Sequence, residues 1–312
     1  MLDVTFGIAI GASATGAPSG DEMAALARHV EAVGFDSLQV GDHVQWYADI
    51  HEATVLMATF AAVTERISIA SDVIILPLRD PVLIAKTIAS LDVLSGGRVV
   101  FGVGLGGDNP AEYAAMRIPM SERGSRADES LEIIRGLFEH ERFSYAGRHF
   151  TIDHVAIAPR PLQAQLPVWV GGTSEGALRR AARFGDGWIS AFASEQKFRR
   201  LGDQLRGLLA ERGRSADGYT IGTFVFVHLD DDTARARKAA AHHVDEVYHL
   251  DGEAVVNRFG VAGPVDACVE RVRRYVEAGA DHIVLYPLCT PSAWRHQVEH
   301  FGEVIARVKG ER

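Results

Sequence analysis

The stretch PVWVGGTSEGALRRAARFGDGWISA, residues 167–191, decides the fold. It places an apolar run, VWV, before two glycines, then an amphipathic segment, and then a second apolar run, WIS. The order strand, helix, strand is typical of a βα unit, in which successive strands run parallel. The stretch therefore predicts a mainly parallel sheet with helices packed against it.

The same alternation continues outward along the chain in both directions. It gives eight candidate strands. Seven lie at residues 4–10, 37–42, 67–76, 96–107 with a loop, 167–172, 186–191 and 219–229, and the eighth ends the stretch 263–288. Helices are expected at residues 21–33, 53–64, 81–94, 126–141 and 175–185, in the first part of 263–288, and finally at 294–308. Residues 232–260 are interpreted as a helical connection without a strand. Eight βα units without an interrupting linker favour a closed α/β barrel, the (β/α)8 TIM barrel, over an open doubly wound sheet.

One segment departs from the repeat. Residues 142–161, between the fourth helix and the fifth strand, alternate apolar and polar side chains, which is typical of an antiparallel hairpin. We expect this hairpin to be an insertion outside the barrel. We also expect residues 1–312 to form a single domain.

The composition excludes several classes of protein. The chain has 32 Lys and Arg against 41 Asp and Glu, a net charge of −9 without a basic stripe, so a nucleic-acid partner is not expected. Two cysteines, Cys268 and Cys289, are too few for a disulfide framework or a zinc cluster, and we expect buried thiols and no metal. No apolar run reaches the roughly 20 residues of a membrane span, and the N-terminus lacks a basic leader, which favours a cytoplasmic protein.

Candidate functional residues follow the ends of the strands. In a closed barrel the C-terminal strand ends and their loops form the functional face. This topology brings together side chains that are far apart in sequence: Asp42, His43, residues 104–109, residues 171–174, Ser190 and Tyr286.

The motif GGTS, residues 171–174, is a candidate phosphate site. Gly171 and Gly172 allow close backbone approach, Thr173 and Ser174 offer hydroxyls, and the N–H groups at a helix start favour an anion. The alternative is an ordinary tight turn with a Ser or Thr cap. The motif is neither a Walker nor a dinucleotide fingerprint.

Two further strand ends carry unusual residues. Gly104, Gly106 and Gly107 leave the fourth strand, where glycines let a flat ligand lie against the backbone or serve strand packing. Asp72 stands before Val73 inside an apolar strand, where an ionised carboxylate is costly without a partner. Asp72 could equally accept backbone hydrogen bonds at a bulge.

The pair Asp42 and His43 closes the second strand. An imidazole exchanges protons near neutral pH, and a carboxylate fixes its tautomer and orientation. The alternative is a hydrogen-bonded turn, and adjacent strand residues point to opposite faces, so the two need not share one role. Three other histidines, His242, His243 and His249, are interpreted as part of a solvated helix surface.

Four segments together resemble a known family. They are GFDSLQVGDHV, RISIASDVIILPLRDPVLIAKTIASLDVLSGGRVVFGVGLGG, RADESLEIIRGLF and PVWVGGTSEGALRRAARFGDGWI, which begin at residues 34, 66, 126 and 167. In this order they resemble the luciferase-like flavin monooxygenase superfamily, and more closely its branch that uses the deazaflavin coenzyme F420. The likeness is strong to about residue 190 and weaker beyond it.

The resemblance implies a cofactor ring at the C-terminal strand ends and its phosphate on GGTS. It matches Asp42 and His43 to an aspartate and a histidine of the deazaflavin branch, with the histidine facing the ring. Flavin members more often have EHH at this point. By position the resemblance also implies a cis peptide between Asp72 and Val73, behind the ring.

Two features bear on the substrate and on the cofactor's acidic tail. Some sugar-phosphate dehydrogenases of the branch have a catalytic glutamate after the fourth strand, where this chain has Gly107 and Asp108. A sugar phosphate is therefore not supported, though Asp108 could serve another substrate. The arginines that could meet the acidic tail are Arg123, Arg126, Arg179 and Arg180.

The resemblance implies hydride transfer between F420 and a small organic molecule. His43 would then handle the proton, and Asp42 would position the ring or the imidazole. The alternatives are an FMN-dependent monooxygenase that uses reduced flavin and oxygen, and a barrel that has lost its activity. Family likeness also suggests a homodimer, with Trp46 or Tyr47 beside the substrate.

Overall fold

The computed structural model describes residues 4–107 and 109–310. Within them, eight parallel strands close into a barrel, which confirms the fold expected from the sequence. Neighbouring strands pair in chain order, β1 pairs with β12, and β9 pairs with β10, so the ring has no open edge. The strands are β1 (Thr5–Ile10), β2 (Ser37–Val40), β3 (Ser68–Ser71), β5 (Val99–Gly104), β8 (Val168–Gly171), β9 (Gly187–Ser190), β10 (Thr220–Leu229) and β12 (His282–Pro287).

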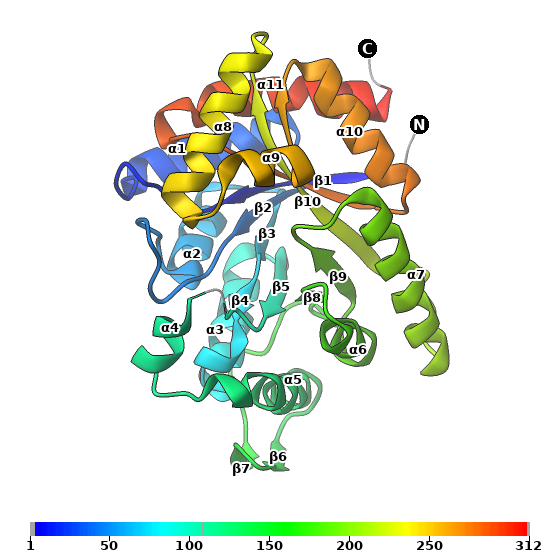
Figure 1. Ribbon diagram of the computed structural model, residues 1–312. Helices are drawn as coiled ribbons and strands as arrows, with labels where there is room; N and C mark the ends of the chain where they lie inside the picture. The colour runs from blue at the N-terminus through cyan, green and yellow to red at the C-terminus, as the bar shows by residue number, and fades with distance from the viewer. Residues whose placement is uncertain (1–3, 108, 311–312) are drawn as a thin grey trace.

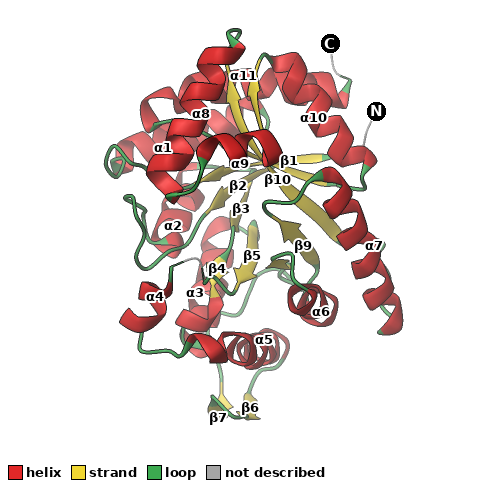
Figure 2. Cartoon of the chain, viewed as in Figure 1, coloured by secondary structure: helices red, strands yellow, loops and turns green. Residues whose placement is uncertain are grey.

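Helices surround the strands on the outside (Figure 1, Figure 2). The main ones are α1 (Gly20–Val33), α2 (Ala53–Val63), α3 (Pro81–Ser95), α5 (Arg123–Glu139), α6 (Glu175–Phe184), α7 (Glu195–Glu211), α10 (Val265–Glu277) and α11 (Pro291–Lys309). Local signals set their ends: Ser19 forms a capping box with Glu22, and Gly34 ends α1 in the left-handed conformation. The main hydrophobic core lies between these helices and the outward faces of the strands.

Several elements were not expected in this form. The run at residues 67–76 does not form one strand, because it is divided into β3, β4 (Ile74–Ile75) and the beginning of a 3-10 helix (Leu76–Leu78). The connection at residues 232–260 is two helices, α8 (Thr233–Tyr248) and α9 (Gly252–Phe259), and Gly260 already belongs to a short strand, β11 (Gly260–Gly263). A short helix, α4 (Pro110–Ala115), and a 3-10 turn (Met120–Glu122) precede α5.

The inserted hairpin lies where the sequence places it. Strands β6 (Phe143–Ala146) and β7 (Thr151–Val155) pair antiparallel between α5 and β8, and they project away from the barrel (Figure 1). The carboxylate of Glu129 on α5 accepts hydrogen bonds from the backbone of Arg148, His149 and Phe150. The hairpin is therefore anchored to α5 and contributes no strand to the barrel.

The barrel interior differs between its two ends. Toward the strand N-termini, Gln39 Nε2 lies 2.8 Å from His282 Nε2 and donates to Ser37 Oγ at 2.9 Å. Gly7 lies beside them, and a Cβ there would come within 2.5 Å of Gln39 Nε2, so a larger residue would displace this polar group. Burial lowers the pKa of His282 to about 4. Toward the C-termini the interior becomes aromatic, with Phe224, Phe226 and Tyr286.

The cysteines, two of the histidines and the helix lengths bear on three further expectations from the sequence. Cys268 and Cys289 are buried free thiols, as expected. The interpretation of all three histidines as solvated was wrong for His243, which is buried on α8 because it faces the barrel side of that helix. His249 ends α8 in the left-handed conformation and is exposed. Among the described helices, none has the length and apolar character needed to cross a membrane.

Candidate active site

His43 lies just beyond the C-terminal end of β2. Its Nδ1 is 3.2 Å from both carboxylate oxygens of Glu112, and its ring stacks on Trp46 at a centroid distance of 3.8 Å. Its hydrogen bonds within the described residues are made through Nδ1, and Nε2 makes none. When Nδ1 donates its proton to a carboxylate, the neutral ring presents Nε2 as an acceptor. The arrangement therefore fixes the ring and leaves one nitrogen available for proton exchange.

Glu112, on the short helix α4, was not identified from the sequence. It is fully buried, and Oε1 also accepts hydrogen bonds from the N–H groups of Val44 at 2.7 Å and Gln45 at 3.3 Å. Asn109 caps α4 and donates through Nδ2 to the carbonyl of Gln45 at 2.9 Å. The one available signal was the order Asn-Pro-x-Glu, since Asn is a good cap and Pro favours the first helical turn.

Asp42 has a different environment from His43. It is buried, and its carboxylate accepts hydrogen bonds from the N–H of Ile75 at 2.9 Å and from Arg79 at 2.5 Å. Burial raises the pKa of Asp42, although Arg79 and the Ile75 N–H oppose this effect. Asp42 thus connects the end of β2 to the segment after β3. Its role toward a ring or an imidazole stays a prediction.

The ends of β3, β5 and β8 come together around Val73. The Asp72–Val73 peptide is cis, as the resemblance implies. A Cβ on Gly104 would lie 2.3 Å from Val73 Cγ2, and one on Gly171 would lie 3.0 Å from Cγ1. Glycines on two separate strands therefore leave the space that Val73 occupies. Beside it, Oδ2 of Asp72 is buried without a hydrogen-bond partner among the described residues.

The other two glycines of the fourth-strand loop have left-handed backbones. Gly106 has φ 59° and Gly107 has φ 116°, conformations that favour glycine. A Cβ on Gly106 would come within 2.9 Å of Ile75, whereas one on Gly107 would lie 3.8 Å from Arg123 Nε. The hypothesis about Asp108 lies outside the described residues.

The GGTS motif connects the end of β8 to the N-cap of α6. Gly172 has φ 118°, and its carbonyl accepts a hydrogen bond from Trp188 Nε1 at 2.7 Å. Ser174 caps the helix by accepting from the N–H of Ala177. Thr173 Oγ1 lies 3.1 Å from Nζ of Lys197, near the start of α7. A capped helix start beside a lysine favours an anion.

The arginines that the sequence suggested for the acidic tail have other partners in most cases. The ion pairs are Arg179–Glu175, Arg180–Asp128 and Arg126–Glu122. Arg123 donates to the carbonyl of Met120 and lies beside Gly107. Lys197 was missed because no motif marks it, and only the fold brings α7 next to GGTS.

A connected group of aromatic rings lies at the same end of the barrel. Trp46 contacts Tyr47 and Tyr248, and Tyr47 stacks on His249 at 4.4 Å. Tyr248 continues the contact to Tyr286, and from there to the rings of Phe226, Phe192 and Phe259. The rings give this side of the mouth an apolar surface, while Lys197 lies on the side of the GGTS loop.

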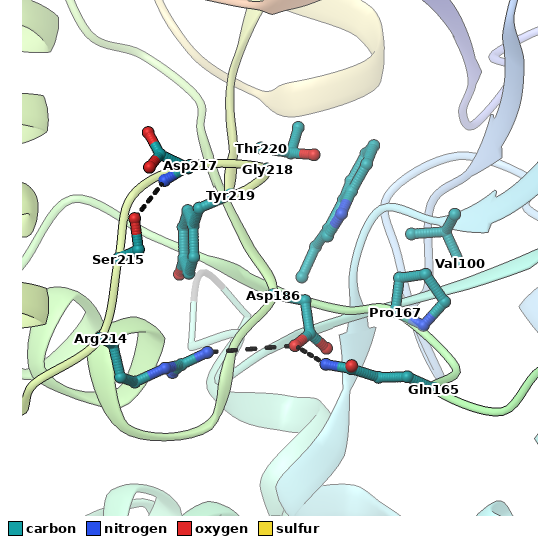
Figure 3. Close-up of a pocket in the computed structure, with 11 residues that line it drawn as sticks. Val100, Gln165, Pro167, Asp186, Arg214, Ser215, Asp217, Gly218, Tyr219 and Thr220 are labelled. Atoms are coloured by element: carbon teal, nitrogen blue, oxygen red, sulfur yellow. Dashed lines mark hydrogen bonds and ion pairs between the residues drawn. The ribbon is translucent and has the colours of Figure 1, made fainter.

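Another cavity lies away from these residues, at the N-terminal ends of β5, β8, β9 and β10. It has a volume of about 460 Å³, and Figure 3 shows its polar side chains facing one another. Asp186 accepts hydrogen bonds from Gln165 Nε2 at 2.8 Å and the Val168 N–H at 3.0 Å, and pairs with Arg135 and Arg214. Because these groups satisfy one another, the cavity has the character of a structural network. In the part of the chain that the structure describes, no group of three potential metal ligands occurs.

Comparisons with known proteins identify the family of the chain. The family model for luciferase-like monooxygenases matches residues 4–282. An F420-dependent glucose-6-phosphate dehydrogenase from Microbacterium testaceum is 30% identical over 308 residues, covering 90% of this chain and 88% of that protein.

Two solved structures have the same fold. An F420-dependent secondary alcohol dehydrogenase in complex with an F420-acetone adduct superimposes with a TM-score of 0.84 at 19% identity, covering 98% of this chain and 99% of that chain. The monooxygenase RslO1 from Streptomyces bottropensis superimposes with a TM-score of 0.86 at 20% identity, covering 97% of this chain and 99% of that chain. The match over most of the chain, together with the closed barrel, shows that the chain belongs to the luciferase-like monooxygenase family.

Proposed function

We propose that this protein is an F420-dependent oxidoreductase that transfers a hydride between the coenzyme and a small organic molecule at the barrel mouth. The observation that carries the proposal is His43, whose Nδ1 is held by the buried Glu112 while Nε2 stays free for a proton. The F420-dependent relative, at 30% identity over 90% of this chain, supports F420 as the coenzyme.

The residues at the mouth fit a flat cofactor with an anionic tail. Val73, seated between Gly104 and Gly171, supplies an apolar support for a ring, and no side chain at either glycine blocks it. Thr173 and Lys197, with the first turn of α6, suit the phosphate. We therefore assign Val73 to the ring and the GGTS loop to the tail.

When bound, F420 supplies a ring carbon that gives or accepts a hydride. The chain supplies position and proton handling. Nε2 of His43 exchanges a proton with the substrate oxygen, Glu112 keeps the imidazole in the required tautomer, and Trp46 covers one face of the imidazole. The aromatic rings around Tyr248 and Tyr286 exclude water from the substrate side.

Binding and oxygen consumption discriminate this proposal from an FMN-dependent monooxygenase. Titration of the purified protein with F420 and with FMN, followed by cofactor fluorescence, should show tight binding of F420 alone. An oxygen electrode should record no consumption during turnover. Tight FMN binding with oxygen consumption would overturn the proposal in favour of the monooxygenase, whose fold is shared by solved structures such as RslO1.

A substitution at His43 tests the proton role directly. His43→Ala should abolish turnover and leave the F420 dissociation constant nearly unchanged. The matched control is His296→Ala, which removes an exposed histidine from α11. Turnover that survives in His43→Ala would remove this residue from the mechanism.

The family resemblance leads us to propose also a homodimer. Multi-angle light scattering on the purified protein measures the assembly directly. A mass of about twice that of the chain, 33.8 kDa, supports the dimer, and the mass of one chain contradicts it.

A further inference from the structure

Asp72 faces the barrel interior at its functional end. Gln39 of β2 is paired with Ala70 of β3 in the parallel register, and Gln39 contacts His282 inside the barrel. Residues paired across two parallel strands have side chains on the same face of the sheet, and side chains two positions apart along one strand also lie on the same face. Asp72, two residues beyond Ala70, therefore points toward the mouth, next to the support formed by Val73.

The carboxyl group of Asp72 has no compensating partner. The backbone N–H of Asp72 donates to the carbonyl of Val40 at 2.7 Å. The side-chain atom Oδ2, in contrast, is buried and has no hydrogen-bond partner among the described residues. Burial raises the pKa of Asp72 well above its usual range, and no charged group in the described structure opposes this effect.

The charged groups next to Asp72 are already paired with each other. At the end of β2, Asp42 is bound by Arg79 and His43 by Glu112. The neighbouring strand β5 has no ionisable side chain, and on the α2 side Glu52 also pairs with Arg79. No cation is left in this part of the structure to hold an ionised Asp72.

We propose that Asp72 is a neutral carboxylic acid in the cofactor-free protein and that its O–H donates a hydrogen bond to an acceptor atom of the bound cofactor ring. This inference rests on the proposed function for the identity of the ring. A flat ring placed on Val73 covers the adjacent carboxyl and removes its remaining water, which makes ionisation still more costly. A neutral acid has one donor to offer, and the oxygen and nitrogen acceptors of such a ring are the groups it can satisfy.

Infrared spectroscopy of the cofactor-free protein tests the protonation state. The wild type should show the carbonyl stretch of a protonated carboxylic acid at neutral pH, and Asp72→Asn should lack that band. Asp231→Asn, which changes an exposed aspartate beside α8, should retain it. If the wild type has no such band, or if Asp72→Asn keeps it, the proposal is overturned.

Binding measurements test the donor role. At neutral pH, Asp72→Asn, which keeps a donor of similar shape, should bind F420 at least as well as the wild type, and Asp72→Ala should bind it at least several-fold more weakly. Above the pH at which the infrared band fades, wild-type affinity should fall by about tenfold per pH unit relative to Asp72→Asn. The measured quantity is the ratio of the wild-type affinity to the Asp72→Asn affinity. A change in the ionisation of the cofactor affects both affinities equally and cancels in this ratio.

The outcomes separate this inference from the proposed function. Equal affinities of Asp72→Ala and the wild type, or a constant ratio across the pH at which the band fades, overturn the donor role while F420 binding stands. If wild-type protein binds FMN and not F420, the proposed coenzyme fails, and the same ratio measured with FMN decides the role of Asp72. Binding of neither cofactor overturns both the proposed function and the donor role.

Discussion

Three acids near the barrel mouth have three different environments. Asp42 is bound by Arg79 and a backbone N–H, and Glu112 accepts hydrogen bonds from two backbone N–H groups and His43. Asp72 has neither a cation nor a donor for its buried oxygen. The first two groups hold loops in place, and their ionised forms are compensated. Asp72 makes no such contribution to the cofactor-free fold. Its replacement should therefore raise the free energy of unfolding, whereas replacing either of the other two acids should lower it.

Asp72→Asn should stabilise the protein, and the gain should grow as the pH rises. In the unfolded chain an aspartate ionises near pH 4, while burial keeps Asp72 protonated to a higher pH. The folded state then binds more protons, so the free energy of unfolding falls with pH between the two pKa values, by up to about 1.4 kcal/mol per pH unit. Urea unfolding at pH 5 and pH 8 measures this difference. Asp231→Asn is the control, and a gain equal at both pH values would contradict the argument.

Glu112→Gln should lower kcat with little change in the KM for either substrate. The amide cannot offer two carboxylate oxygens to Nδ1 of His43 and the Val44 N–H, so the imidazole loses its fixed tautomer. We expect kcat to fall by about 10²-fold and its pH profile to change shape. Glu139→Gln, at an exposed position at the end of α5, should leave both unchanged. A loss of stability without a changed pH profile would make Glu112 purely structural.

At the scale of elements, the packing of strand ends depends on glycines. Gly104→Ala should destabilise the protein by about 1–3 kcal/mol, because its Cβ would lie 2.3 Å from Val73 Cγ2. Gly207→Ala, on helix α7 with open space around the new Cβ, should instead stabilise it by up to about 1 kcal/mol. If Val73 packs as the structure shows, the melting temperature should fall in Gly104→Ala and rise in Gly207→Ala. An unchanged melting temperature in Gly104→Ala would contradict this packing.

Helix α7 contributes Lys197, the cation beside the GGTS loop. Lys197→Met should weaken F420 binding roughly tenfold and make it less sensitive to salt, since an ion pair with the cofactor tail is screened by salt. Arg206→Met removes a cation nine residues further along the same helix, where it pairs with Asp203. Isothermal titration at two salt concentrations compares the variants, and equal losses in both would indicate a general effect of net charge.

The elements of the barrel follow from sequence more readily than the contacts between them. Apolar runs and caps such as Ser19 and Gly34 act locally, so α1 ends where its sequence predicts. The division of the third strand was not predicted, because it depends on Ser71 and Val73 fitting against glycines of other strands. Glu112 and Lys197 were missed for the same reason, since each acts on a residue more than 20 positions away.

At the scale of the whole molecule, the cavity around Asp186 and the C-terminal mouth differ in how their acids are held. Asp186 pairs with Arg135 and Arg214 and accepts hydrogen bonds from Gln165 and the Val168 N–H; Figure 3 shows the contacts with Arg214 and Gln165. At the C-terminal mouth, His43 is partly exposed with its Nδ1 held by Glu112, and Asp72 Oδ2 is buried without a hydrogen-bond partner among the described residues. Satisfied groups stabilise a fold, whereas unsatisfied ones cost free energy and are retained where a ligand binds. This contrast favours the C-terminal end as the site.

Closure of the barrel should make the described chain unfold in a single step. The first strand pairs with the last, Thr5 beside His282, and β9 pairs with β10, so any division into two parts would expose unpaired strand edges on both. The tryptophans sample separate regions, in the β2 loop, β8, β9 and α11: Trp46, Trp169, Trp188 and Trp294. Urea unfolding curves from tryptophan fluorescence and far-UV circular dichroism should therefore coincide, and Trp294→Phe should leave the fluorescence transition at the midpoint seen by circular dichroism of the same variant. Two separated transitions would divide the chain into two units and contradict a single domain.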